Sequence, residues 1–171
     1  MKPPSALRQV EPRTTPFPSR QLSPTQLARL VRATAAARDQ WQPVVRFTPR
    51  RRWFHRLALT DEYETWLLTW LPGQRTGFHD HGGASGAFAV ARGDLRETLA
   101  SPVSSRLRHR TARNGTVTSF GGQHVHDVGN IGHVPAVSVH AYSPPLSAMR
   151  RYETTGSGLT LVRTDQVEVD W

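Results

Sequence analysis

Short runs of apolar residues, alternating with polar ones and bounded by turn residues, follow one another through most of the chain after residue 52. Eight such runs predict β-strands. They span residues 53–59, 64–71, 86–91, 94–99, 115–119, 136–142, 149–152 and 159–162. Strands of this length and spacing are typical of an antiparallel barrel or sandwich, and they are hard to reconcile with a helix-only fold. Residues 100–113, with arginines at alternate positions, fit either an exposed edge strand or a loop.

Residues 23–39 have a different pattern, because their apolar positions recur at helical spacing. Ser23 is a natural N-cap, Pro24 fits the first helical position and Gln26 completes a capping box. The apolar stripe consists of Leu27, Leu30, Val31 and Ala35. The sequence therefore predicts an N-terminal helix at about residues 23–39, packed on the outside of the strands.

Residues 1–20 lack any periodic apolar pattern and contain five prolines. Such a segment buries too little apolar surface to offset the entropy lost on ordering, so we expect a disordered, basic, proline-rich arm. A chain of 171 residues has the length of one domain. Residues 21–171 are therefore expected to form a single domain.

The formal net charge of +9 is concentrated at the front of the chain. Residues 1–56 hold 12 Lys and Arg against two acidic residues, whereas the rest holds 10 against 11. Charge alone does not predict a nucleic-acid partner, and the basic segment lacks interleaved aromatic residues or a known motif. We therefore expect no nucleic-acid partner.

The sequence contains no cysteine, which excludes a disulfide scaffold and any cysteine-ligated metal. It has no run of 18 apolar residues, and its first residues lack the apolar core of a signal peptide. We therefore expect a cytoplasmic monomer without a membrane partner.

Two histidines, His79 and His81, are separated by one residue. On an extended strand, residues i and i+2 point to the same face, so the two imidazoles converge on one metal ion. A third ligand must come from elsewhere in the chain. His124 and His126 share a face of a later strand, and both are candidates.

Glycines around these histidines complete a pattern that resembles the two-part signature of the cupin barrels. Gly73, His79, His81 and Gly93 match the first part, and Gly115, His126 and Asn130 match the second. The spacing to Asn130 favours His126 over His124 as the third ligand. Gly86 stands where most cupins have a glutamate ligand, and Gly121 and Gln123 replace a proline and a glycine. The resemblance implies an all-β core, a small cupin (jelly-roll) β-barrel, with a metal site of three neutral histidines and no carboxylate.

The run Ser138-Val139-His140-Ala141-Tyr142-Ser143-Pro144-Pro145 narrows this resemblance. Together with the all-histidine site, it makes residues 52–152 similar to the type I cysteine dioxygenases, which are cupin-fold thiol dioxygenases with mononuclear non-haem iron. The resemblance implies one Fe(II) per chain, held by His79, His81 and His126. It also implies that the substrates are a small-molecule thiol and O₂, with L-cysteine converted to cysteine sulfinic acid. Ligand softness alone does not choose among iron, nickel, copper and zinc.

Three neutral ligands would leave the site with the metal's full +2 charge. This charge favours an incoming thiolate and lowers the pKa of the substrate thiol. Because a thiolate makes iron easier to oxidise, dioxygen is expected to bind productively only after the substrate. Asp80, between the first two ligands, is expected to face away from the metal as a turn or surface carboxylate. The remaining histidines, His55, His109 and His133, are expected on the surface.

Ser138, His140 and Tyr142 alternate along one predicted strand, so they face the same side and can form a hydrogen-bonded chain. A purely structural polar ladder is the alternative. The resemblance implies a catalytic relay, with Tyr142 as hydrogen-bond or proton donor and His140 as its orienter. A cis peptide bond at Ser143-Pro144 is compatible with the turn but cannot be read from the sequence.

A substrate carboxylate needs a fixed cation, and arginine offers a planar two-point match. The resemblance implies Arg56, on the strand before His79, as this residue. Related 3-mercaptopropionate dioxygenases generally have glutamine there, so Arg56 favours cysteine as substrate. Arg151, nine residues after Tyr142, is a second candidate, and it keeps 3-mercaptopropionate or another small thiol open.

Mammalian members have a cysteine at the position of Gly86 that crosslinks to the tyrosine matching Tyr142. This chain has no cysteine and cannot form that crosslink. We expect the loss to affect efficiency and tyrosine positioning more than reaction type, and the space left by Gly86 to admit a longer substrate. A non-catalytic metal-binding cupin is the remaining alternative.

Overall fold

The computed structural model describes residues 21–101 and 103–166, so the arm expected at residues 1–20 lies outside the described part. The helices are α1 (Pro24–Ala36), α2 (Arg38–Trp41) and the 3₁₀ helix η1 (Gln42–Val44). The strands are β1 (Phe54–Leu59), β2 (Glu64–Trp70), β3 (Phe78–His79), β4 (Ser85–Arg92), β5 (Leu95–Ser101), β6 (Ser104–Ala112), β7 (Val117–Phe120), β8 (Val125–Gly129), β9 (Ala136–Ser143), β10 (Ala148–Thr155) and β11 (Gly158–Gln166).

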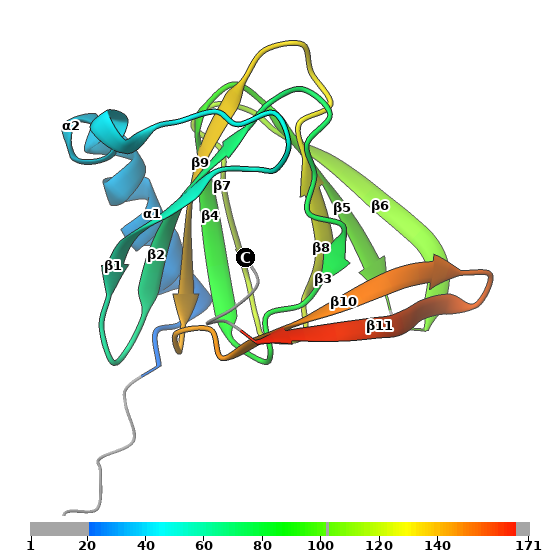
Figure 1. Ribbon diagram of the computed structural model, residues 1–171. Coiled ribbons are helices and arrows are strands. Elements are labelled where there is room, and N and C mark those ends of the chain that lie inside the picture. Colours follow the sequence, from blue (N-terminus) through cyan, green and yellow to red (C-terminus); the bar gives the residue numbers. More distant parts are fainter. Residues whose placement is uncertain (1–20, 102, 167–171) are drawn as a thin grey trace, which may run out of the picture.

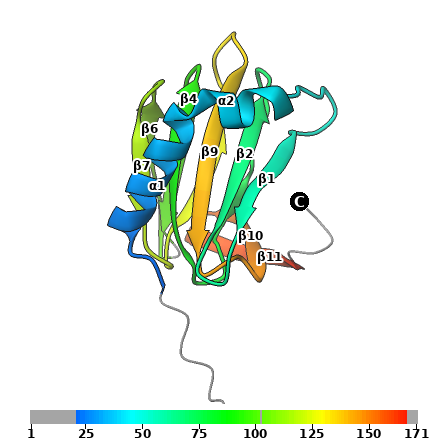
Figure 2. The ribbon, with the colours of Figure 1, turned by 90° about the vertical axis from the view of Figure 1, so that its left-hand side faces the viewer.

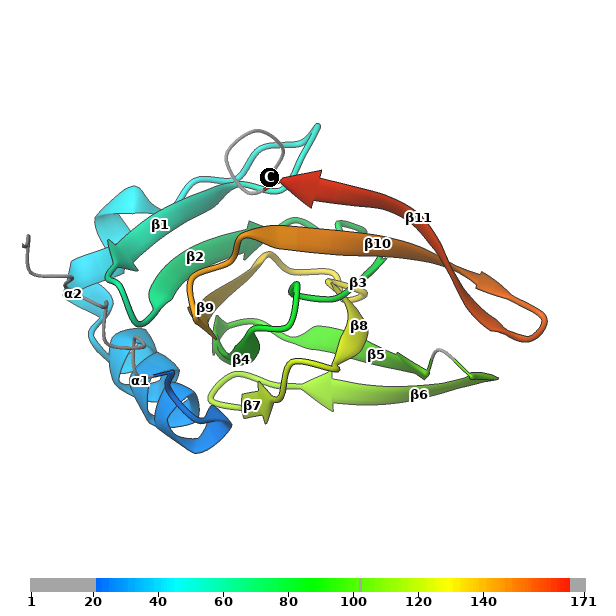
Figure 3. The ribbon, with the colours of Figure 1, turned by 90° about the horizontal axis from the view of Figure 1, so that it is seen from below.

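The strands form two antiparallel sheets that face each other and enclose the interior of the molecule (Figures 1 and 3). One sheet has the order β1-β2-β9-β4-β7 and the other the order β11-β10-β3-β8-β5-β6. Each predicted strand overlaps an observed one. The arginine-rich segment proves to be β6, an edge strand rather than a loop.

Two apolar clusters lie on opposite faces of the five-stranded sheet, which explains why all seven residues of β2 are buried. Leu68 and Trp70 point into the space between the sheets, whereas Leu67 points outward to the helices. On β4, Phe88 fills the interior, and its neighbour Ala87 lies under the helix. A small outward side chain lets the helix approach the sheet closely.

Helix α1 lies across the outer face of β4, β7 and β9 (Figure 2), as the sequence predicted. Ser23 and Gln26 form the expected capping box. Leu27 and Val31 are completely buried at 0% exposure, and each such side chain contributes about 1.5–3 kcal/mol. The helix ends at Ala36, earlier than expected, because Ala37 leaves the helical conformation with φ −81° and ψ 65°. Neither α1 nor any other helix of residues 21–101 and 103–166 has the length and apolar character to cross a membrane.

Candidate metal centre

Three buried histidines meet between the sheets, on the interior side of β3 and β8. His79 on β3 lies directly opposite His126 in the pairing of these two strands, and His81 follows two residues after His79. One ring nitrogen from each histidine lies within 4.8 Å of the others. The ring centroids are 4.8 to 5.1 Å apart. The structure therefore brings together the three residues that the sequence selected as metal ligands.

The hydrogen bonds of these rings leave a nitrogen of each available for a metal. Nδ1 of His79 donates to the Gly77 carbonyl at 2.9 Å, and Nδ1 of His126 donates to Glu97 Oε1 at 2.7 Å. Each ring therefore keeps Nε2 for another partner. Nε2 of His81 is buried and has no hydrogen-bond partner within the described part of the protein. An orphaned nitrogen beside two further imidazoles fits a metal ligand.

Burial also keeps these imidazoles in the neutral form that binds metals. It lowers the pKa of His79 and His81 well below the ordinary value, and the proximity of the histidines to one another adds to the effect. Burial lowers the pKa of His126 as well, although Glu97 partly opposes the shift. At neutral pH no proton competes with a metal for these sites.

His124, the rival third ligand, lies behind His126 rather than beside the other two histidines. Its Nε2 donates to Glu97 Oε1 at 2.9 Å, and its ring stacks on Phe120 with centroids 4.3 Å apart. Of the two candidates left open by the sequence, His126 is the one whose ring nitrogen lies close to those of both His79 and His81. The remaining histidines, His55, His109 and His133, are exposed as expected.

Asp80 faces away from the three histidines and caps a turn, one of the two roles that the sequence suggested, but it is buried rather than on the surface. Its carboxylate is buried and accepts hydrogen bonds from the Tyr152 hydroxyl at 2.7 Å and the Gly82 amide at 2.9 Å. Arg150 pairs with it at 2.8 Å. The carboxylate is not exposed because β10 lies against β3 and covers it.

Ser138, His140 and Tyr142 form the expected hydrogen-bonded chain on β9, and all three are buried. Ser138 Oγ lies 2.8 Å from His140 Nε2, and the Tyr142 hydroxyl lies 3.3 Å from His140 Nδ1. Trp70 Nε1 donates to Ser138 Oγ at 2.9 Å and fixes the far end of the chain. The following Ser143-Pro144 peptide bond is cis.

The space beside Gly86 is filled, contrary to the expectation that it would admit a longer substrate. A Cβ added to Gly86 would lie 2.4 Å from Cε2 of Phe120 and 3.0 Å from Cδ1 of Tyr142. Phe120 and Tyr142 each stack on His81 with ring centroids 4.9 Å apart. Both rings therefore restrict the orientation of this candidate ligand.

Replacing Gly86 with alanine is expected to destabilise the fold by about 1–3 kcal/mol, because the added methyl group overlaps the Phe120 ring. The free energy of unfolding in urea measures this effect. Gly121→Ala is the matched control, since a Cβ at Gly121 meets no atom within 4 Å. Phe120→Leu should recover part of the loss in the Gly86→Ala background. Equal stability of Gly86→Ala and Gly121→Ala would mean that the ring does not occupy this space.

A small cavity of about 10 Å³ adjoins the histidines, and an open groove lies next to it on the surface. Its lining consists of Arg52, Leu68, Thr76, His79, His126, Val128, His140, Tyr142, Met149 and Arg151. The groove is lined by Arg52, Thr76, Gly77, Phe78, Arg151, Tyr152, Glu153, Val162 and Arg163. Arg52, Thr76 and Arg151 line both, so they lie between the groove and the cavity.

Arg52, just before β1, is the cavity residue that sequence reasoning missed. Its guanidinium lies 4.6 Å from the ring centroid of Trp70, and its Nε is buried without a hydrogen-bond partner in the described part of the chain. Burial lowers the pKa of Arg52 to about 10, so the group remains charged at neutral pH. Its place after Arg50 and Arg51 made it resemble surface charge, and only the following strand start at Trp53 could have drawn attention to it.

Arg56, the arginine selected from the sequence, does not line the cavity. Its side chain is 46% exposed, lies 4.0 Å from Glu64 and is placed over the ring of Trp66. Arg56 is exposed because β1 is the edge strand of its sheet, where solvent remains accessible to long side chains. The structure thus replaces Arg56 with Arg52 as the arginine near the histidines.

Arg151, the second arginine selected from the sequence, does line the cavity. It lies opposite His79 in the pairing of β10 and β3. Its Nε donates to Asp165 at 2.7 Å, and its Nη1 donates to the Thr76 carbonyl at 3.3 Å. These partners hold the guanidinium in place, while Asp165 offsets part of its charge.

Comparison with known proteins gives one family and one fold. A family model described as cysteine dioxygenase type I matches residues 17–155. Cysteine dioxygenase type 1 of Danio rerio is 25% identical over 150 residues, which cover 80% of this chain and 73% of the relative.

Several solved structures share the architecture. A protein from Thermus thermophilus matches with a TM-score of 0.54 at 17% identity, over 61% of this chain and 93% of that chain. A Klebsiella pneumoniae protein with a double-stranded β-helix domain matches with a TM-score of 0.53 at 18% identity, over 71% and 93% of the two chains. At these identities the likeness shows the fold alone, and it confirms the predicted cupin barrel with an outer N-terminal helix.

Proposed function

This chain belongs to the cysteine dioxygenase type I family, and on that premise we propose that it is an iron(II) enzyme that oxidises L-cysteine to cysteine sulfinic acid. Both atoms of one dioxygen molecule join the sulfur, so that RSH and O₂ give RSO₂H without another reductant. The observation that carries the proposal is that neutral histidines, a partly buried arginine and a hydrogen-bonded tyrosine adjoin one cavity.

His79, His81 and His126 are the residues that would hold the iron. Their nitrogens are buried and close together, and Nε2 of His81 has no other partner among the described residues. Iron(II) bound there would supply the redox chemistry and the open coordination positions that a thiol and dioxygen need. Because three imidazoles also suit nickel, copper or zinc, the choice of iron rests on family membership.

Arg52 would bind the substrate carboxylate in place of Arg56. Its side chain is partly buried and charged, and its buried Nε has no hydrogen-bond partner within residues 21–101 and 103–166. A planar two-point match to a carboxylate would satisfy it. Arg151, already paired with Asp165, would add a second positive charge at the mouth of the cavity.

Tyr142 would donate a hydrogen bond or a proton to the oxidised sulfur group. Burial raises the pKa of its hydroxyl far above the ordinary value, so the hydroxyl stays protonated. If Ser138 donates to His140 Nε2, then Nδ1 of His140 carries the ring proton and donates to the Tyr142 oxygen. In this arrangement His140 orients Tyr142 and leaves the hydroxyl proton of Tyr142 free for the substrate.

Tyr142→Phe is expected to lower kcat about 100-fold while KM for the thiol changes little, because it removes a hydroxyl used during the chemical step. Steady-state oxygen uptake over a range of thiol concentrations separates the two parameters. Tyr63→Phe, in the turn between β1 and β2, is the matched control and should retain wild-type kinetics. An unchanged kcat for Tyr142→Phe would mean that the hydrogen bonds among Ser138, His140 and Tyr142 are purely structural.

A second candidate function is the oxidation of 3-mercaptopropionate, which lacks the amine of cysteine. It is favoured by Arg151, which lines the cavity, and by the absence of a carboxylate among the described lining residues that would pair with an ammonium group. The two substrates share the thiol and the carboxylate. Discrimination between them would therefore rest on the amine.

Oxygen uptake by the iron(II)-reconstituted protein, measured in parallel with L-cysteine, 3-mercaptopropionate and cysteamine, tests these candidates. We expect the highest kcat/KM with L-cysteine and a product heavier by two oxygen atoms in mass spectrometry. A preference for 3-mercaptopropionate would establish the second candidate. Stoichiometric iron without uptake for any thiol would instead indicate a non-catalytic metal-binding cupin.

A further inference from the structure

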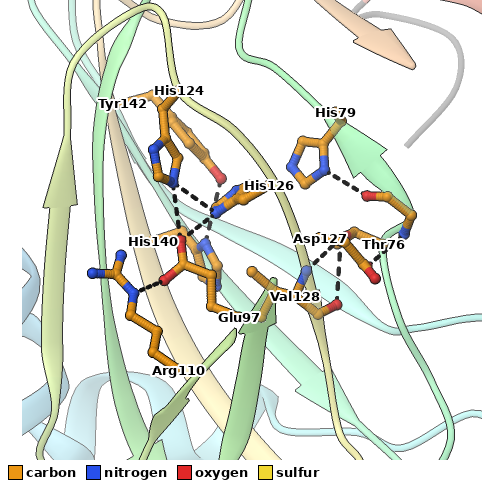
Figure 4. Close-up of polar contacts among 11 residues, drawn as sticks. Thr76, His79, Glu97, Arg110, His124, His126, Asp127, Val128, His140 and Tyr142 are labelled. Carbon is orange, nitrogen blue, oxygen red and sulfur yellow. Dashed lines mark hydrogen bonds and ion pairs between the residues drawn. The ribbon is translucent and has the colours of Figure 1, made fainter. Parts of the chain in front are cut away.

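A completely buried carboxylate, that of Glu97, lies directly behind His126 (Figure 4). Glu97 is on β5, which pairs with β8, and its side chain has 0% exposure. Its Oε1 accepts a hydrogen bond from Nδ1 of His126 at 2.7 Å. The carboxylate is therefore separated from the candidate metal position only by the imidazole ring.

Two further groups hold Glu97 in this place. Nε2 of His124 donates to the same Oε1 at 2.9 Å, and Nε of Arg110 donates to Oε2. Burial by itself raises the pKa of Glu97, but the hydrogen bonds from His124, His126 and Arg110 outweigh it and hold the pKa well below the ordinary value. A negative charge thus lies one hydrogen bond behind the ligand.

Glu97, His124 and His126 are close enough to be considered as a second metal site, but their spacing is that of hydrogen bonds. The two histidine nitrogens lie 2.7 Å and 2.9 Å from the carboxylate oxygen. Tetrahedral ligands about 2.0–2.2 Å from a metal lie roughly 3.3 Å apart, which is longer than either distance. A metal there would also have to displace the proton of His126 Nδ1.

We propose that Glu97 is a positioning residue for the metal centre and takes over, from behind a ligand, the role of the carboxylate that most cupins place on the metal. It holds the His126 ring with Nε2 toward the other histidines, and its charge makes that nitrogen a stronger donor. The inference rests on the metal-binding part of the proposed function. It revises the sequence-based picture of a site without a carboxylate, because a carboxylate is present one layer further out.

Arg110 has the opposite effect to Glu97 on the donor strength of His126. Its side chain is 43% exposed and contacts the Glu97 oxygen that faces away from His126. The arginine therefore draws part of the carboxylate charge outward. Removing Glu97 should weaken His126 as a donor, whereas removing Arg110 should leave more negative charge for His126 and strengthen it.

The test is anaerobic iron(II) titration of the full-length protein, together with the midpoint potential of the iron-loaded form. Glu97→Gln keeps the shape but removes the charge, and it is expected to weaken iron affinity 10- to 100-fold and to raise the potential. Arg110→Leu is expected to lower the potential. Glu64→Gln is the matched control, because Glu64 is equally buried but accepts from the Leu146 amide rather than from a histidine.

An affinity and a potential within error of wild type for Glu97→Gln would overturn the proposal. If that variant does not fold, Arg110→Leu decides, because it leaves Glu97 in place: an unchanged potential or a raised one would overturn the proposal. Both quantities are measured without thiol or dioxygen. Failure of the proposed reaction therefore leaves this test intact, and wild-type affinity in an active Glu97→Gln enzyme would reject only the role of Glu97.

Discussion

His126→Ala is expected to abolish stoichiometric iron binding and all thiol-dependent oxygen uptake. The substitution removes the one candidate ligand that β8 contributes, and His79 and His81 then remain as two neutral ligands. It also leaves the buried Glu97 carboxylate without its closest hydrogen-bond donor among the histidines. Iron content after anaerobic reconstitution and gel filtration, followed by oxygen-electrode assays with L-cysteine, measures both losses.

His124→Ala and His109→Ala separate this effect from the loss of any histidine. His124→Ala should still bind one iron per chain, because His124 lies behind the centre and contacts Glu97. His109→Ala changes an exposed residue and should match wild type in iron content and turnover. Iron bound by His126→Ala but not by His124→Ala would make His124 the third ligand. That result would require a different conformation of β8.

Arg52→Ala is expected to raise KM for L-cysteine about 100-fold with a smaller effect on kcat. Two charge-assisted hydrogen bonds to the substrate carboxylate are lost, together worth roughly 3 kcal/mol. Arg52→Lys should fall between wild type and alanine, because an ammonium group keeps the charge but not the planar two-point geometry. Initial rates of oxygen uptake against thiol concentration provide the KM values.

Cysteamine and Arg56→Ala are the two controls for this prediction. Cysteamine has no carboxylate, so its KM should be the same in Arg52→Ala and in wild type. Arg56→Ala changes an arginine of the same strand region that lies outside the cavity, and its KM for L-cysteine should be that of wild type. A raised KM for Arg56→Ala, with none for Arg52→Ala, would restore the assignment made from the sequence. If Arg151→Ala raised KM for L-cysteine more than Arg52→Ala, Arg151 would be the residue that binds the substrate carboxylate.

Local regularities of the chain were enough to predict the helix start and most of the strands. The capping box at Ser23 and Gln26 depends on neighbouring residues only. The chain of Ser138, His140 and Tyr142 depends on the two-residue alternation of a strand. Such features require no knowledge of which strand lies beside which, so a single sequence contains them.

Local alternation along a strand predicted only part of the candidate metal triad. His79 and His81 share a strand face, but the choice between His126 and His124 needed the spacing to Asn130, a pattern learned from a family. In the structure the choice follows from register, because His79 is paired with His126 across β3 and β8. Because His124 and His126 share a strand face, a shift of two residues would be needed to bring His124 opposite His79.

What the sequence determined by itself is thus the residue pattern: the helix start, most strand segments, the three histidines that meet between the sheets and the hydrogen-bonded chain on β9. What only the tertiary structure decided is which distant residues surround them. Arg52 lines the cavity, whereas Arg56 on edge strand β1 is exposed. Phe120 fills the space beside Gly86, and Glu97 lies behind His126, since β7 pairs with β4 and β5 pairs with β8. Contacts of this kind depend on strand order and register, and these follow from packing of the whole barrel rather than from any local stretch of chain.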